Sequence, residues 1–111
     1  MIEIIKTFYE KNKRFGYLKD IHLLRDITDE GCTDYQINLI LTNYPYYEGD
    51  EIFNIIFKGV KDIKIGKLDG LLKLVFEIRD LSSDCLENIK FRVYESENEI
   101  LSFYCNEIII V

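Results

Sequence analysis

A change of hydrophobic period after residue 16 constrains the fold of this chain more than any other feature. Before it, apolar residues recur every three or four positions, whereas from residue 35 onward they alternate with polar residues at every second position. The first spacing is typical of a helix, and the second is typical of a β-strand whose two faces differ. The chain is therefore expected to fold as one helix followed by a sheet with one wet face.

The helix is predicted over residues 2–15. Glu3 lies in its first turn, basic residues crowd its last turn, where they complement the helix dipole, and Gly16 is the expected C-cap. This position explains the basic cluster without nucleic-acid binding. The apolar positions are Ile2, Ile5, Phe8 and Tyr9, and the basic ones are Lys11, Lys13 and Arg14.

Alternation predicts strands over residues 35–42, 51–60 and 71–80. The β-branched and aromatic residues after position 88 continue the same bias. We predict a mainly β (α+β) fold, in which about seven mostly antiparallel strands form a curved sheet, a sandwich or a partial barrel. A chain of 111 residues without linkers or repeats is long enough for one core, so residues 1–111 are expected to form a single globular domain.

Turn residues favour hairpins over crossover connections. Asp69-Gly70 lies between two alternating runs and predicts a tight two-residue turn. Asp29-Glu30-Gly31 and Glu48-Gly49-Asp50 are weaker signals of the same kind, and residues 95–99 are expected to form the bend between the last two runs.

The segment from Asp26 to Glu51 is the most unusual part of the chain in its charge. It contains seven carboxylates and four tyrosines but no Lys or Arg. Clustered carboxylates attract a basic partner and speed its arrival, and tyrosines supply contact area at low entropic cost. Pro45, inside Asn-Tyr-Pro-Tyr-Tyr, is expected to stiffen the loop. The predicted partner-binding residues are Asp29, Glu30, Asp34, Tyr44, Tyr46, Tyr47, Glu48, Asp50 and Glu51.

Signals of catalysis and of cofactor binding are weak. His22 is the one histidine, and neither Cys85 nor Cys105 lies in a motif that would pair it with a base. The run from Asp26 to Gly31 offers oxygen ligands, but its spacing does not fit an EF-hand loop. No glycine-rich phosphate loop is present. We therefore expect a protein that is not an enzyme and that has no catalytic residues, no metal and no cofactor.

Composition restricts the compartment and the partners. The first residues lack the apolar core of a signal peptide, and no apolar run approaches the roughly 18 residues of a spanning helix, so a cytoplasmic protein without a membrane partner is expected. The three cysteines, Cys32, Cys85 and Cys105, are expected to be reduced. The net charge of −6 disfavours direct nucleic-acid binding, because phosphate affinity depends on clustered Lys and Arg.

Two segments carry a resemblance to a known family: Phe57-Lys58-Gly59-Val60-x-Asp62-Ile63-Lys64-Ile65 and Phe76-Glu77-Ile78-Arg79-Asp80-Leu81. With the amphipathic start and the strand order, the chain resembles bacterial immunity proteins of contact-dependent growth inhibition and related polymorphic-toxin systems. The resemblance implies an inhibitor that binds the C-terminal domain of a cognate toxin. Many such toxins are basic nucleases, so the inhibitor would cover the active site or the substrate entry surface.

Other interpretations remain open. A second acidic zone is a second-choice interface, or its residues 95, 97 and 99 lie on a solvated hairpin tip. It consists of Asp84, Glu87, Glu95, Glu97 and Glu99. The carboxylates and tyrosines could instead line the pocket of a small-ligand or metal-binding β domain. The run Glu107–Val111 is apolar enough to add to a sheet edge in a structural oligomer, and the oligomeric state is left open.

Overall fold

A computed structural model describes residues 2–84 and 86–111 and contains the helix that the first period predicts. Helix α1 spans Ile2–Arg14, with Glu3 in its first turn and basic residues in its last. The backbone amide of Phe15 still donates to the carbonyl of Lys11 (2.9 Å). Gly16 follows the helix without a left-handed φ, so its role is close packing: a Cβ there would lie 2.8 Å from Cγ of Lys73.

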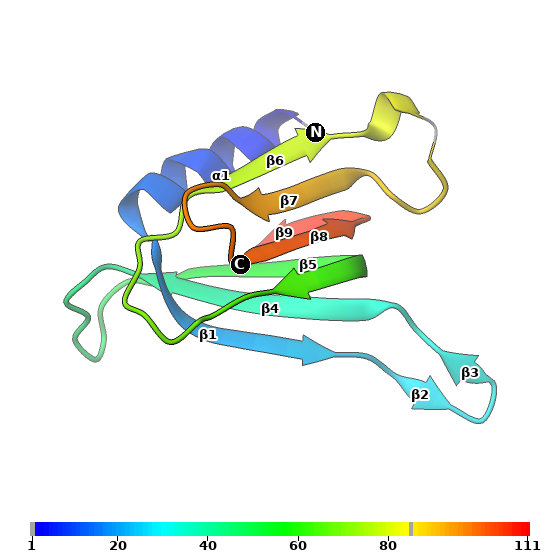
Figure 1. The fold of residues 1–111 in the computed structure, drawn as a ribbon, viewed down its shortest axis with the longest axis horizontal. Helices are drawn as coiled ribbons and strands as arrows, with labels where there is room; N and C mark the ends of the chain where they lie inside the picture. The colour runs from blue at the N-terminus through cyan, green and yellow to red at the C-terminus, as the bar shows by residue number, and fades with distance from the viewer. Residues whose placement is uncertain (1, 85) are drawn as a thin grey trace.

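The described part of the chain has nine strands, and seven of them belong to one antiparallel sheet (Figure 1). The sheet order is β1-β4-β5-β8-β7-β6, and β9 also pairs with β5. The prediction of a mainly β fold with one helix is confirmed, and the sheet is open. The strands are β1 (Tyr17–Leu24), β2 (Ile27–Thr28), β3 (Gly31–Cys32), β4 (Tyr35–Thr42), β5 (Phe53–Ile65), β6 (Phe76–Asp80), β7 (Phe91–Glu95), β8 (Leu101–Cys105) and β9 (Glu107–Ile110), and the 3₁₀ turn η1 covers Ser82–Asp84.

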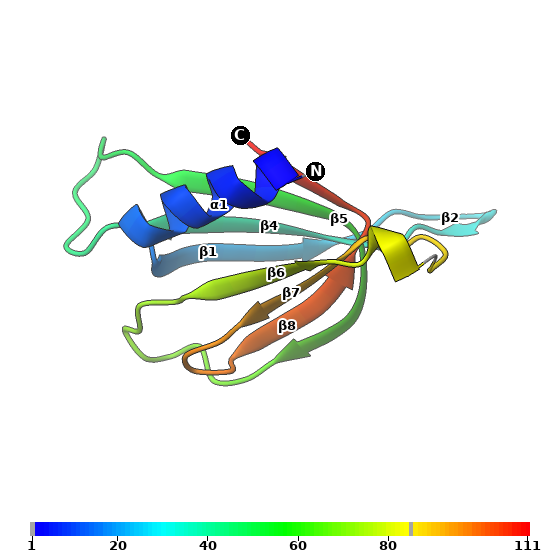
Figure 2. The ribbon, with the colours of Figure 1, turned by 90° about the horizontal axis from the view of Figure 1, so that it is seen from above.

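Strand β5 bends and thereby divides the sheet into two layers. Its first half pairs with β4 and β9, and its second half pairs with β8. Gly59 (φ 65°) and Asp62 (φ 55°) have left-handed backbones at the bend, and the register with β8 shifts between Lys61 and Lys64. Figure 2 shows β1 and β4 in one layer, β6 to β8 in the other, and β5 passing from the first to the second.

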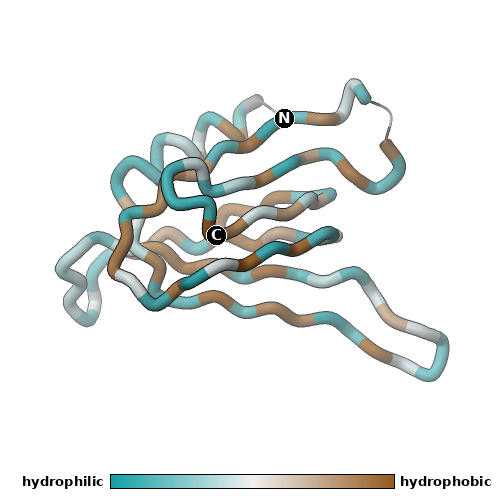
Figure 3. Tube along the Cα trace, viewed as in Figure 1, coloured by the Kyte–Doolittle hydropathy of each residue, from teal (hydrophilic) through white to brown (hydrophobic). Residues whose placement is uncertain are grey.

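The core fills the space between these layers. Alternate residues of each strand face it, and Figure 3 shows the corresponding alternation of hydropathy along the trace. Helix α1 places Phe8 at its centre, with ring centroids 5.2 Å from Phe53, 6.4 Å from Phe57 and 6.0 Å from Phe76. The pairs with Phe53 and Phe76 are edge-to-face, and such pairs add directional stability to the area that they bury.

Two polar side chains of α1 attach it to the edge strand β6. Asn12, which is 6% exposed, donates through Nδ2 to the carbonyls of Phe15 (3.3 Å) and Leu74 (3.1 Å), and its Oδ1 accepts from the amide of Phe76 (2.9 Å). The Tyr9 hydroxyl accepts from the amide of Ile78 (3.0 Å) and donates to its carbonyl (3.1 Å). These bonds satisfy backbone groups that an edge strand would otherwise leave unpaired.

One predicted hairpin is wrong. The runs on either side of Asp69-Gly70 do not pair with each other, because β5 continues into a pairing with β8 while β6 pairs with β7. Residues 66–75 form a long connection that reaches back to β1, where Tyr17 bridges to Lys73. The predicted strand over residues 71–80 is accordingly shortened to Phe76–Asp80.

The other predicted turns are confirmed. The β2–β3 hairpin reverses at Asp29-Glu30, the β4–β5 connection turns at Glu48-Gly49, and the segment after Glu95 joins the paired strands β7 and β8. Gly31 (φ 132°) and Gly49 (φ 92°) have backbones that favour glycine.

Candidate functional site

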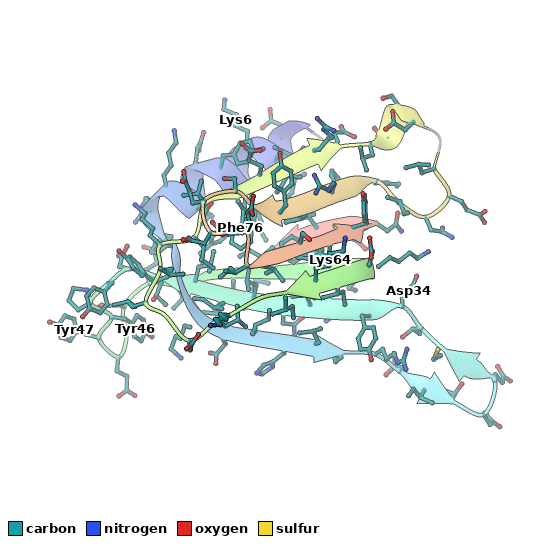
Figure 4. All side chains as sticks on the ribbon, viewed as in Figure 1. Lys6, Asp34, Tyr46, Tyr47, Lys64 and Phe76 are labelled. Atoms are coloured by element: carbon teal, nitrogen blue, oxygen red, sulfur yellow. The ribbon has the colours of Figure 1, made fainter. Side chains whose placement is uncertain are left out.

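The nine predicted partner-binding residues lie in two groups at opposite ends of β4. Asp29 and Glu30 form the turn of the β2–β3 hairpin, Asp34 lies between β3 and β4, and the others belong to the loop after β4. The eight residues of β4 span about 26 Å at roughly 3.3 Å per residue. Figure 4 shows Asp34 at one end of the molecule, and Tyr46 and Tyr47 at the other.

The first group forms a projecting acidic arm, which we define as residues 25–34. The arm extends beyond the body of the sheet (Figure 1). Thr33 closes its base, since its Oγ1 accepts from the amide of Asp26 (2.9 Å) and its own amide donates to the carbonyl of Asp26 (2.9 Å). Thr28 supports the turn by accepting from the amide of Glu30 (3.2 Å). These bonds use backbone and hydroxyl groups and leave the carboxylates outward.

Carboxylates of the acidic arm are mostly free of partners within the described part of the chain. Asp34 lies 3.8 Å from Nζ of Lys61, whereas Asp26, Asp29 and Glu30 form no ion pair there. The guanidinium of Arg25 lies 4.6 Å from the centroid of the Tyr35 ring. At the start of β2, Ile27 is 71% exposed, so the arm presents an apolar side chain beside its charges.

The second group forms a tyrosine loop, which we define as residues 43–52. Its turn is closed by Asp50, whose Oδ2 accepts from the amide of Tyr47 (2.9 Å) and whose amide donates to the Tyr47 carbonyl (2.9 Å). Tyr44 and Tyr47 are exposed, while the ring of Tyr44 lies 5.6 Å from that of Tyr17. The Tyr44–Pro45 peptide bond is cis.

Basic residues from elsewhere in the chain lie against the tyrosine loop. Nη2 of Arg14 is 3.6 Å from Oε1 of Glu51, and Nζ of Lys19 is 5.7 Å from the centroid of the Tyr46 ring. Asp50 is engaged in the turn, so of the three loop carboxylates Glu48 alone has no bond within the described residues. The surroundings of the tyrosine loop are therefore less acidic than its own sequence suggests.

A basic face, which the sequence did not predict, covers the outer side of the second layer. The register places Arg79 opposite Arg92, Arg92 opposite Tyr104, and Tyr104 opposite Lys61. Lys64, which Figure 4 labels, lies nearby opposite Ser102. The guanidinium of Arg92 packs 4.4 Å from the centroid of the Tyr94 ring. Alternation alone could have placed these residues outside, but it could not have paired their strands.

The second acidic zone contains one residue that has a structural role. Glu95 is 1% exposed, and its carboxylate accepts hydrogen bonds from the amides of Val75 (3.2 Å), Glu97 (3.0 Å) and Asn98 (2.7 Å). Glu95 therefore ties the β7–β8 turn to Val75, the residue before β6. Glu97 and Glu99 lie exposed around this turn.

Three hydrogen bonds shift the pKa values of two surface groups, Asp80 and Tyr94. The side-chain and backbone hydrogen bonds of Ser82 to the Asp80 carboxylate lower the pKa of Asp80. The hydroxyl of Tyr94 donates to the Glu77 carboxylate, and this bond raises the pKa of Tyr94. Both groups are on the surface, so these shifts describe local pairing rather than a reaction site.

Candidate catalytic groups are not brought together in the described residues. His22 is exposed on β1, whereas Cys105 is fully buried on the inner side of β8, and burial raises the pKa of its thiol to about 12. Such a thiol is almost entirely protonated near neutral pH and is a poor nucleophile. Cys85, the other candidate, lies outside the described residues. Within the described ranges no group of three His, Cys, Asp or Glu residues is placed to hold a metal ion.

The distinctive groups of the molecule thus lie on exposed projections and faces, as in a small domain that acts by binding another protein. A family model described as Immunity protein PIM8 matches residues 1–111, and the chain belongs to this family of immunity proteins. The family supports a toxin-neutralising role and implies a cognate toxin as partner. No curated protein and no solved structure matches the chain. Among the described residues, no helix is long and apolar enough to cross a membrane.

Proposed function

We propose that this immunity protein neutralises a basic nuclease toxin by placing the acidic arm against the surface that the toxin uses for its substrate. A nuclease presents Lys and Arg to phosphates, and carboxylates are anions that can occupy the same positions. The observation that carries the proposal is a projecting hairpin whose turn bears Asp29 and Glu30, neither of which forms an ion pair within the described residues.

Interface size favours the arm over a site that uses both ends. A standard interface covers about 800 Å² on each partner, which corresponds to a patch roughly 30 Å across. The molecule measures 43 Å along its longest axis, with the acidic arm and the tyrosine loop at opposite ends of it. One toxin domain therefore engages one end and the sheet beside it.

Unpaired carboxylates decide between the two ends. At the arm, four carboxylates (Asp26, Asp29, Glu30, Asp34) face three cations (Arg25, Lys58, Lys61), which leaves −1. At the tyrosine loop, four carboxylates (Asp20, Glu48, Asp50, Glu51) face three cations (Lys11, Arg14, Lys19), which also leaves −1. Three arm carboxylates form no ion pair within the described residues, whereas at the loop Glu48 alone has no bond there, so the arm attracts a basic partner more strongly.

The tyrosine loop is the second site for the same role. Tyr44, Tyr46 and Tyr47 would be its contact anchors, and Glu48, Asp50 and Glu51 would pair with the partner's cations. Since Asp50 closes the turn and Glu51 pairs with Arg14, recruiting them would require existing bonds to be replaced. We therefore rank the loop below the arm.

The protein would act as a stoichiometric inhibitor in the cytoplasm of the cell that makes the toxin, within a contact-dependent or related polymorphic-toxin system. It needs no cofactor and no direct contact with nucleic acid for this role. The toxin's catalytic groups are covered, not altered.

The experiment begins by capturing the toxin with the wild-type chain as bait and purifying the captured domain. Its association rate is then measured between about 20 and 500 mM salt for the wild type and for the double variant Asp29→Asn/Glu30→Gln. Removing two steering charges should slow association about tenfold at low salt and flatten its salt dependence.

The matched control is Glu48→Gln/Glu51→Gln, which removes the same charge from the tyrosine loop. It should retain most of the association rate. If the loop variant is slowed and the arm variant is not, the site lies at the other end of the molecule. If the wild type captures no domain with nuclease activity, the nuclease proposal fails.

A further inference from the structure

The outer face of the first layer has an uncommon composition for a sheet face exposed to water. Strands β1, β4, β5 and β9 turn their buried residues toward α1 and the core, so the alternate residues point outward. Asn38, Ile56 and Ile109 lie opposite one another in one cross-strand row, and Ile40 lies opposite Asn54 in the next. All five are half-exposed. On β1, His22 continues the first row beside Asn38 and Asp20 continues the second beside Ile40, so both rows end in a polar side chain.

We define the amide–isoleucine face by these five residues: Asn38, Ile40, Asn54, Ile56 and Ile109. None of them is charged, although 31% of the chain is. Charges appear at its margins instead, where Lys58 lies opposite Glu107 and Asp20 lies opposite Ile40. Depletion of charge at the centre with a charged rim is the composition of a protein–protein interface.

The outer face of the second layer provides an internal comparison. Its corresponding cross-strand rows carry Arg79 opposite Arg92 and Glu77 opposite Tyr94, as expected for a solvated sheet surface. The two outer faces belong to the same bent sheet, so the sheet itself does not require the uncharged composition of the first. The three isoleucines also lie on the side away from the helix and make up a patch without a described partner.

The amide–isoleucine face is continuous with the acidic arm. An open hollow of about 340 Å³ lies where they meet. Leu24, Gln36 and Lys58 line it from the sheet, and Asp26 and Asp34 line it from the arm. Three strands about 4.8 Å apart and about six residues long give the face an area near 300 Å², a little over a third of what one partner contributes to a standard interface.

We infer that the toxin domain docks on the amide–isoleucine face while the acidic arm reaches its basic surface. This inference rests on the proposed function and names a second part of the same interface. The isoleucines supply dry contact that slows dissociation, and the arm supplies the charge that speeds arrival. A second copy of this chain is disfavoured as the occupant. Each copy carries a net charge of −6, so two copies repel each other, whereas a basic domain is attracted.

The test uses Ile56→Thr/Ile109→Thr, which keeps β-branched residues and changes no charge. The matched control is Leu71→Thr/Leu86→Thr, because these two leucines are 61% and 48% exposed in other parts of the chain. The probe is the purified toxin domain that the wild type captures. The face variant should bind it about 10- to 100-fold more weakly, mainly through faster dissociation, whereas the control should bind as the wild type does.

Further measurements separate the failure of this inference from the failure of the proposed function. If Asp29→Asn/Glu30→Gln slows association while the face variant dissociates at the wild-type rate, the arm stands and the docking face is refuted. If wild-type mass rises with concentration in sedimentation and the face variant abolishes the rise, the face is a self-association surface and the inference is overturned. If no domain is captured, the proposed function fails and the inference loses its partner.

Folding is controlled by thermal unfolding of each variant before binding is compared. If the double variant is unfolded, Ile109→Thr alone replaces it, because β9 pairs with β5 on one side and tolerates substitution better than a central strand. The single variant should still dissociate several-fold faster than the wild type. A wild-type dissociation rate for a folded single variant would overturn the inference.

Discussion

Replacing Asn12 by Ala tests how the helix holds the edge of the sheet. The side chain is 6% exposed and makes three hydrogen bonds, two of them to the backbone of the β6 edge at Leu74 and Phe76. The third, to Phe15, secures the helix end. Without the amide, one backbone N–H and two carbonyls lose their partner, and no other side chain of α1 takes this position.

The magnitude follows from the bonds and from the space around them. Each hydrogen bond contributes about 1 kcal/mol net, and a buried group left unpaired costs about 1–3 kcal/mol. A hollow of about 260 Å³ beside Asn12 lets water reach part of the site, so the free energy of unfolding should fall by about 2.5 kcal/mol. With an unfolding entropy of about 2.1 cal/mol/K per residue, 111 residues give a drop in Tm of roughly 10 °C.

The assay is denaturant and thermal unfolding followed by circular dichroism. Asn43→Ala is the control, because Asn43 is exposed and should change stability by less than about 0.5 kcal/mol. Asn12→Asp keeps the acceptor for Phe76 but points an oxygen at two carbonyls, so it should be no more stable than the alanine variant at pH 7. If Asn12→Ala has the same free energy of unfolding and the same Tm as Asn43→Ala, the attachment of the helix to the strand is not what stabilises this edge.

Three further predictions concern a buried carboxylate, the bend in β5 and the thiols. Glu95→Ala should lower the free energy of unfolding by about 2–4 kcal/mol in urea melts, because three backbone amides lose their acceptor; a loss under 1 kcal/mol would contradict this. Gly59→Ala should cost about 1–3 kcal/mol in the same assay, since φ is 65° and the new Cβ would lie 2.8 Å from Asn106. Iodoacetamide at pH 8 should label Cys32 rapidly and Cys105 only on unfolding, as read by peptide mass; because burial raises the pKa of Cys105 from 9.0 to about 12, the associated stability is full below pH 9 and is lost as pH rises toward 12. Equal labelling of both thiols in the folded protein would refute the buried position.

Local pattern predicted the parts of the fold that depend on local physics. Helix α1 follows from the spacing of residues such as Ile5 and Phe8, and β4 from strict alternation, because both signals reside in neighbouring residues. Which strands pair with each other does not follow from local pattern. Asp69-Gly70 has the chemistry of a hairpin turn, but β5 bends at Gly59 and pairs with β8, which is far away in sequence.

The candidate site was predicted in composition and not in arrangement. Its acidic residues are close in sequence, yet β4 separates Asp34 from Glu48 by the length of a strand. Nor could sequence show that Arg14 pairs with Glu51, because that contact forms only when the end of α1 packs near the loop. Glu95 was assigned to an acidic surface zone, but the chain folds back over it, and its carboxylate accepts backbone amides.

Hydrogen–deuterium exchange on the chain, free and bound to the captured toxin domain, locates the surface that the toxin covers. If the acidic arm binds the toxin, binding slows exchange in residues 25–34 and leaves residues 43–52 unchanged. Protection confined to residues 43–52, with the arm exchanging as fast as in the free protein, would contradict binding through the arm.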